Sequence, residues 1–166
     1  MSSEFELRDA RLEDAEALTE IYNHFVLNTW VTFDLDPKPA EYFREQLRAA
    51  TLPWLVCTEG DQVVAYSYAS PWKSRCAYER TVESTVYVTP DYARRGIGVS
   101  LYRELLARLE EAGTHTVLGG IAVPNDPSIA LHKKLGFEQV GRLREVGRKF
   151  ERWIDVEYWQ KLLGQP

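Results

Sequence analysis

The stretch Thr81-Val-Glu-Ser-Thr-Val-Tyr-Val-Thr-Pro-Asp-Tyr-Ala-Arg-Arg-Gly-Ile-Gly-Val-Ser100 decides the fold. Its first eight residues are rich in β-branched side chains and predict a strand over 81–88. The segment 97–112 carries leucines at helical spacing, and Gly113 marks its end. A second β-branched run follows over 116–123. This strand–helix–strand order predicts the central unit of an α/β sheet.

Elements on either side of this unit are expected from the same kinds of pattern. Apolar residues at helical spacing predict helices over 13–26 and 39–50. The remaining expectations are a short strand over 4–8, a hairpin with strands near 54–58 and 63–68, a polar and aromatic loop over 71–80, a short helix over 127–135 and two further strands within 137–160. The order of these elements predicts a single α/β domain that spans residues 1–166.

The composition limits the classes of function. The chain has 166 residues with 20 basic and 25 acidic side chains, and its net charge of −5 disfavours non-specific binding to nucleic acid. The longest apolar stretch, 117–123, is far shorter than the ~20 residues that cross a bilayer. The N-terminus lacks the pattern of a secretory signal, and Cys57 and Cys76 form no metal-binding motif. We therefore expect a cytoplasmic protein with no metal, no membrane segment and no nucleic-acid partner.

The turn between the predicted strand and helix has the chemistry of an anion site. Gly96 and Gly98 let the backbone approach a ligand, and the N–H groups at the start of the helix can hold a pyrophosphate. Arg94 and Arg95 add positive charge beside them. The loop is neither the dinucleotide fingerprint nor a Walker loop. By itself, a glycine turn with surface arginines is the more frequent explanation of such a pattern.

Glu83 is a carboxylate inside a β-branched strand. With period-two alternation it shares one face of the strand with Thr85 and Tyr87. Burial of a carboxylate raises its pKa toward neutrality, which suits a general base. An exposed or salt-bridged Glu83 explains the same pattern equally well, so the strand alone does not decide its role.

A third group lies in the segment Asn125-Asp-Pro-Ser-Ile-Ala-Leu-His-Lys-Lys-Leu-Gly-Phe137. Asn125 and Ser128 stand at a strand-to-helix junction, and His132 lies about one helical turn after Ser128. A single histidine on a short helix is more often a surface or packing residue than a catalytic one. The segment indicates a function only in combination with the glycine loop and Glu83.

Together, these three features resemble the GNAT superfamily of N-acetyltransferases. Its members carry an acetyl-CoA pyrophosphate loop of the form Gln/Arg-x-x-Gly-x-Gly/Ala, which here reads Ala93-Arg-Arg-Gly-Ile-Gly98. They also carry an Asn…Leu-Tyr-x-x-x-Gly-Phe segment, in which His132 here replaces the Tyr, as Ala93 replaces the Gln or Arg of the loop. The resemblance implies the GNAT fold, an α/β fold with a mixed central sheet of about six to seven strands and flanking helices.

Four further segments are similar to the phosphinothricin acetyltransferase branch of this superfamily, and they are Pro71–Tyr78, Thr81–Val88, Pro124–Ser128 and Trp153–Val156. That branch also acts on methionine sulfoximine and methionine sulfone. The resemblance covers nearly the whole chain. It implies an enzyme that moves an acetyl group from acetyl-CoA to the α-amino group of a small amino-acid-like substrate, by direct attack in a ternary complex. It also implies a cytoplasmic homodimer without a metal.

The resemblance assigns roles to particular residues. Glu83 is the implied base, and His132 either protonates the departing thiolate or helps to deprotonate the amine. The implied contacts to acetyl-CoA come from Val86, Tyr87, Val88, Arg94, Arg95, Gly96, Ile97, Gly98, Val99, Asn125 and Ser128. The implied contacts to the amino-acid substrate come from Phe33, Lys73, Ser74, Arg75, Tyr78 and Glu83.

The residues themselves support one of these substrate contacts. In an extended loop, Lys73 and Arg75 point the same way, and two cations on one face can clamp the carboxylate and the phosphinate or sulfoximine oxygens of a substrate. This pair argues against a polyamine as substrate. Two alternatives to the predicted function remain, namely acetylation of a peptide N-terminus or a polyamine, and a CoA-binding sensor without turnover.

Overall fold

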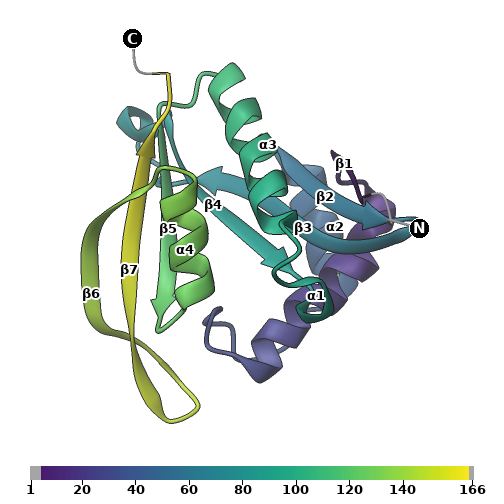
Figure 1. Cartoon of the computed structure of the whole chain (residues 1–166), viewed down its shortest axis with the longest axis horizontal. Coiled ribbons are helices and arrows are strands. Elements are labelled where there is room, and N and C mark those ends of the chain that lie inside the picture. Colours follow the sequence, from purple (N-terminus) through teal and green to yellow (C-terminus); the bar gives the residue numbers. More distant parts are fainter. Residues whose placement is uncertain (1–4, 165–166) are drawn as a thin grey trace.

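A computed structural model of the protein describes residues 5–164. They form one seven-stranded sheet in the order β1-β2-β3-β4-β5-β7-β6, with α1 and α2 on one face and α3 and α4 on the other (Figure 1). The strands are β1 (Phe5–Asp9), β2 (Trp54–Glu59), β3 (Gln62–Pro71), β4 (Thr81–Val88), β5 (Thr116–Val123), β6 (Glu138–Lys149) and β7 (Arg152–Leu162). The helices are α1 (Ala15–Asn28), α2 (Ala40–Ala49), α3 (Ile97–Glu111) and α4 (Asp126–Lys134).

The structure confirms the predicted α/β architecture and the number of strands. All neighbouring strands are antiparallel except β4 and β5, which are parallel and joined through α3. The final hairpin continues to Leu162, two residues past the expected range, because β7 pairs with the whole of β5, from Thr116 to Val123. The predicted loop 71–80 contains one 3₁₀ turn, Cys76–Tyr78.

Two layers of apolar side chains hold the helices on the sheet. The α3 layer is built on Leu101, Leu105 and Leu109, which are completely buried. The α1–α2 layer includes Leu18 and Phe43, which pack with the aromatic side chains of the central strands. Each such side chain contributes roughly 1.5–3 kcal/mol when fully buried, so the leucine stripe of α3 firmly fixes the helix and its N-terminus.

The parallel pair β4–β5 is joined along only part of its length. Thr81–Glu83 pair with Thr116–Leu118, and no pairing follows, although β4 continues to Val88 and β5 to Val123. The two strands therefore separate immediately after Glu83. The separation leaves the facing backbone of both strands available to a ligand.

No helix within residues 5–164 is long and apolar enough to span a membrane.

Candidate active site

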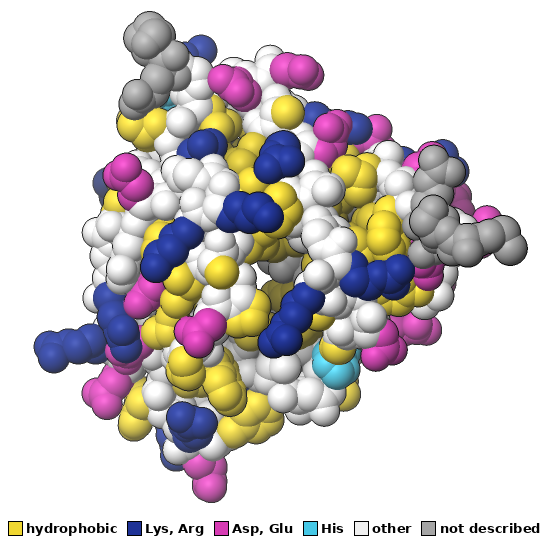
Figure 2. All heavy atoms as spheres, viewed as in Figure 1, with side chains coloured by type: hydrophobic (Ala, Val, Ile, Leu, Met, Phe, Trp, Pro, Cys, Tyr) yellow, Lys and Arg dark blue, Asp and Glu magenta, His cyan; other side chains and the backbone are white. Residues whose placement is uncertain are grey.

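A cavity of about 1000 Å³ occupies the separation between β4 and β5. Its walls are the second halves of both strands, the start of α3 and the inner side of α4. Figure 2 shows a hollow near the centre of this face, with basic side chains at its border. Except for Arg95, every residue predicted to contact acetyl-CoA lines the cavity, namely Val86, Tyr87, Val88, Arg94, Gly96, Ile97, Gly98, Val99, Asn125 and Ser128.

The backbone of β4 presents hydrogen-bonding groups to this cavity. The carbonyl of Arg80 accepts from the N–H of Thr116, so the even-numbered residues of β4 direct their N–H and C=O groups toward β5. After Glu83 that set includes Val86 and Val88, which have lost their partner strand. Tyr87 alternates toward β3, so its backbone does not serve the cavity, and only its side chain lies in the wall.

The start of α3 forms the anion-binding end of the cavity. Gly96 is the residue before the helix and has a φ of 81°, and Arg94 also lies in the left-handed region with a φ of 63°. The first helical hydrogen bond runs from the N–H of Ser100 to the carbonyl of Gly96. The preceding N–H groups have no acceptor within the helix, and the helix dipole adds partial positive charge there. This arrangement suits a pyrophosphate.

Arg95 does not join Arg94 at the cavity. Its guanidinium lies 4.8 Å from the ring centre of Phe5 and 4.9 Å from that of Tyr92, and it pairs with Glu59 at 3.3 Å. The sequence prediction placed both arginines at the pyrophosphate. They differ because the left-handed φ at Arg94 turns the chain between the two side chains.

Asn125 and Ser128 set the start of α4. The side-chain oxygen of Asn125 accepts from the N–H of Ser128 at 3.3 Å and caps the helix. Asn125 therefore has a structural explanation besides its place in the cavity wall. The cap fixes the turn on which His132 stands, because the carbonyl of Ser128 lies 2.7 Å from Nδ1 of that histidine.

Glu83 lies at the point where the two strands part. A Cβ built on Gly120 would lie 3.0 Å from Oε1 of Glu83 and 3.5 Å from the ring of Tyr158, so the missing side chain at 120 makes room for the carboxylate. Within residues 5–164 no side chain forms an ion pair with it. Burial raises the pKa of Glu83, which makes this carboxylate a stronger base.

His132 is almost completely buried and lines the cavity. Its Nδ1 donates to the carbonyl of Ser128, so in the neutral ring Nε2 is the acceptor. The hydroxyl of Tyr102 lies 3.3 Å from Nε2 and also hydrogen-bonds Ser84 Oγ. Burial lowers the pKa of His132, so the neutral form dominates near pH 7. Burial also raises the pKa of Tyr102, so the hydroxyl keeps its proton.

Two adjacent glycines of β5 place these groups on opposite faces of the sheet. A Cβ on Gly119 would lie 2.4 Å from Nε2 of His132, whereas a Cβ on Gly120 would meet Glu83. Consecutive strand residues point to opposite faces, so Glu83 lies on the α1–α2 face and His132 on the α3–α4 face. The two groups can act on one molecule only through the opening between β4 and β5.

The residues predicted to bind the acceptor do not line this cavity. Lys73, Ser74, Arg75 and Tyr78 are exposed on the loop after β3, where Ser70 is the register partner of Glu83. Trp72 brings the loop against Tyr158, with ring centres 5.4 Å apart. The chain bends at Ser74 and Arg75, so the regular alternation assumed for the clamp is absent, and the clamp stays a prediction.

Phe33 lies on the loop between α1 and α2. Its ring lies against Gly147 of β6, so it belongs to a different wall from Lys73 and Arg75. The same loop reaches the cavity through Val31.

Tyr102 and Ser84 were missed as site residues. Tyr102 lies in the apolar stripe of α3 and looked like part of the core, and its partner His132 is 30 residues away. The adjacent Gly119 and Gly120 inside an apolar strand were the one sequence signal of the crowding around both catalytic candidates.

A cleft with exposed strand donors, a helix N-terminus that suits a diphosphate, and a carboxylate and an imidazole on either side of the opening fits acyl transfer from a coenzyme. A family model described as an acetyltransferase (GNAT) domain matches residues 7–158. The phosphinothricin N-acetyltransferase of Streptomyces viridochromogenes is 41% identical over 163 residues, which are 97% of this chain and 89% of the relative. The L-methionine sulfoximine/L-methionine sulfone acetyltransferase of Salmonella typhimurium is 37% identical over 164 residues, which are 96% of this chain and 95% of the relative.

A solved structure is also similar along most of the chain. The phosphinothricin acetyltransferase of Sinorhizobium meliloti, in complex with AcCoA, superposes with a TM-score of 0.93 at 35% identity, over 96% of this chain and 89% of that chain. The chain therefore belongs to the GNAT family. It is an acetyltransferase, and acetyl-CoA is its acetyl donor.

Gly96 offers a test of the coenzyme site with a matched control. An Ala at 96 must adopt a left-handed φ, at a cost of about 1 kcal/mol, and this strain moves the N–H groups that face the pyrophosphate. Gly113, after the other end of α3, has a φ of 85° and equally open surroundings. We expect Gly96→Ala to raise the Kd for acetyl-CoA on the order of tenfold, as measured by calorimetry. Gly113→Ala is expected to lower the free energy of unfolding by a similar amount and to leave the Kd for acetyl-CoA unchanged. Equal affinities in both variants would contradict the assignment.

Glu83 should control the acidic side of the pH profile. A base works only when deprotonated, and burial raises the pKa of Glu83, so kcat/KM is expected to fall as the pH drops through a value above 4.5. Glu83→Gln should lower kcat by about 10²–10⁴ and leave acetyl-CoA binding intact. Glu138→Gln, the same substitution at an exposed position of β6, is the control. Turnover that survives in Glu83→Gln would exclude this residue as the base.

Proposed function

We propose that the protein transfers the acetyl group of acetyl-CoA to the α-amino group of a small amino-acid-like acceptor, such as phosphinothricin, methionine sulfoximine or methionine sulfone. The observation that carries the proposal is the position of Glu83. This half-buried carboxylate, with its raised pKa, lies where β4 and β5 part, and its register partner Ser70 leads into the loop that holds two cations. The names of the relatives from Streptomyces and Salmonella support the same class of acceptor.

The faces of the sheet suggest how the reaction is divided. The thioester lies in the opening between β4 and β5, and backbone N–H groups of β4 polarise its carbonyl. Glu83 takes a proton from the amine on the α1–α2 face, directly or through a water, and the amine nitrogen attacks the carbonyl carbon. The C–S bond then breaks, and the CoA thiolate leaves toward the α3–α4 face. Tyr102 gives the thiolate its hydroxyl proton, since the neutral His132 carries no proton on Nε2; the nitrogen loses its second proton to solvent, and Tyr102 regains a proton from solvent.

The cysteines support direct transfer rather than an acyl-enzyme. Cys57 is buried, and burial raises the pKa of its thiol, which opposes formation of the nucleophilic thiolate. Cys76 is exposed on the loop that carries the acceptor residues and lies outside the cavity wall.

The loop after β3 supplies the recognition of the acceptor. Lys73 lies 5.4 Å from the ring centre of Trp72 and 5.9 Å from that of Tyr78. Within residues 5–164 neither Lys73 nor Arg75 pairs with a carboxylate, so both cations are available to the acidic groups of the acceptor. Ser74 adds a hydroxyl, and Phe33 and Tyr78 wall the pocket.

We further propose a cytoplasmic homodimer. Large exposed apolar side chains concentrate on the β6–β7 hairpin. They are Val140, Leu143, Val146, Phe150, Trp153 and Leu162. A patch of this kind favours contact with another protein surface, and a second copy of the chain is its simplest occupant. The two free cysteines agree with a reducing compartment.

A thiol-release screen tests the function. Phosphinothricin, methionine sulfoximine, methionine sulfone, a short peptide and spermidine are each offered with acetyl-CoA, and free CoA is measured. We expect release with the three amino-acid-like compounds at higher kcat/KM than with the others. A preference for the peptide or for spermidine would replace the proposed acceptor. Binding of acetyl-CoA with no release for any amine would indicate a sensor.

The cationic loop should govern acceptor binding. Because a lost charge-assisted hydrogen bond costs about 1.5–3 kcal/mol, Arg75→Ala and Lys73→Ala are each expected to raise the KM for phosphinothricin by at least about tenfold. The Kd for acetyl-CoA should stay the same. Arg80→Ala removes an exposed cation at the end of the same loop and serves as control. A higher Kd for acetyl-CoA together with an unchanged KM for the acceptor would contradict this role.

A further inference from the structure

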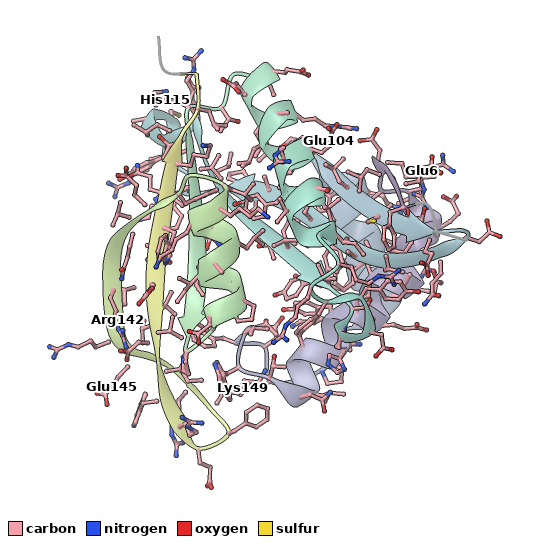
Figure 3. The ribbon with its side chains drawn as sticks, viewed as in Figure 1. Glu6, Glu104, His115, Arg142, Glu145 and Lys149 are labelled. Carbon is pink, nitrogen blue, oxygen red and sulfur yellow. The ribbon has the colours of Figure 1, made fainter. Side chains whose placement is uncertain are left out.

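The loop between α1 and α2 rests on the end of the β6–β7 hairpin at three points. The guanidinium of Arg152 lies 5.3 Å from the ring centre of Trp30. The carbonyl of Thr32 accepts from Nζ of Lys149 at 2.9 Å. The ring of Phe33 covers Gly147. Figure 3 shows Lys149 near the lower end of the hairpin, close to this loop.

Gly147 leaves space that the Phe33 ring occupies. A Cβ at position 147 would lie 2.3 Å from both Cε2 and Cζ of that ring. The backbone of Gly147 does not have a left-handed φ, so an alanine there would suffer no conformational strain. The only strong demand for glycine at this position is therefore the room that it gives to Phe33.

The backbone that carries Phe33 cannot easily retreat from a larger residue. Lys149 is almost completely buried, with 4% of its surface exposed, and it binds the carbonyl of the preceding residue, Thr32. The hydroxyl of Thr32 is itself 2.8 Å from that of Tyr22 on α1. With this backbone held, the ring alone must move, by about 1 Å to regain a normal contact distance.

We propose that Gly147 is a positioning residue for acceptor binding: it seats the Phe33 ring against the hairpin and thereby sets the room for the side chain of the acceptor. The inference rests on the proposed function, in which Phe33 walls the acceptor pocket. The effect is confined to the acceptor, because neither Phe33 nor Gly147 lines the coenzyme cavity.

The test uses the full chain and two alanine substitutions in one strand. Gly147→Ala drives the ring outward, whereas Gly141→Ala on the same β6 meets nothing within 4 Å and serves as the control. We expect Gly147→Ala to raise the KM for phosphinothricin and methionine sulfoximine by about tenfold, since a misplacement of about 1 Å in a binding wall is costly. The kcat and the Kd for acetyl-CoA should stay near those of the wild type. Gly141→Ala should leave all these values unchanged.

A double variant separates the ring contact from a general disturbance of the hairpin. Phe33→Leu removes the far atoms of the ring, so Gly147→Ala is expected to have no further effect on KM in that background. If Gly147→Ala does not fold, Lys149→Met provides a second approach to the same loop, and it too should raise KM with little change in kcat.

The outcomes distinguish a failure of the role of Gly147 from a failure of the proposed function. A wild-type enzyme that acetylates these acceptors, with unchanged KM in Gly147→Ala or Lys149→Met, would overturn the inference alone. An equal loss of kcat and coenzyme binding would also overturn it, because it would show general disruption. A wild-type protein that acetylates none of the acceptors would overturn the proposed function, and the inference would fall with it.

Discussion

The function depends on the point at which two parallel strands stop pairing. β4 and β5 are joined through Glu83 and Leu118 and then separate, although both strands continue. Backbone groups that a normal sheet would satisfy internally are left facing a cavity, and buried groups of this kind need a partner. A coenzyme with an extended arm can supply that partner. The helix that joins the two strands begins at the same cavity, so its N-terminus faces the anionic part of the same ligand.

The opening also connects two chemical environments. The carboxylate of Glu83 belongs to the face covered by α1 and α2, while Tyr102 and His132 belong to the face covered by α3 and α4. Burial shifts the pKa of each group in the direction that favours its neutral form. A reaction that removes a proton on one side and returns one on the other fits this division.

The sequence predicted those parts of the molecule that depend on local patterns. The strand over 81–88, the leucine stripe of α3 and the glycine turn between them could be read because their periodicity and turn chemistry are local. Local patterns could not predict the separation of β4 from β5, since register is a tertiary property. Tyr102 was hidden among leucines, because its polar partners come from other elements. The contacts of Arg95 with Phe5, Tyr92 and Glu59 were not foreseen either, because Phe5 and Glu59 are distant in the chain.

The contact between Gly119 and His132 links two positions 13 residues apart in the chain. The imidazole occupies the volume in which any side chain at 119 would begin. A side chain at 119 is therefore expected to be tolerated only together with a smaller group at 132. A larger residue at 119 alone would displace the imidazole from Tyr102, and a smaller residue at 132 alone would leave a void beside the strand, so the two positions constrain each other.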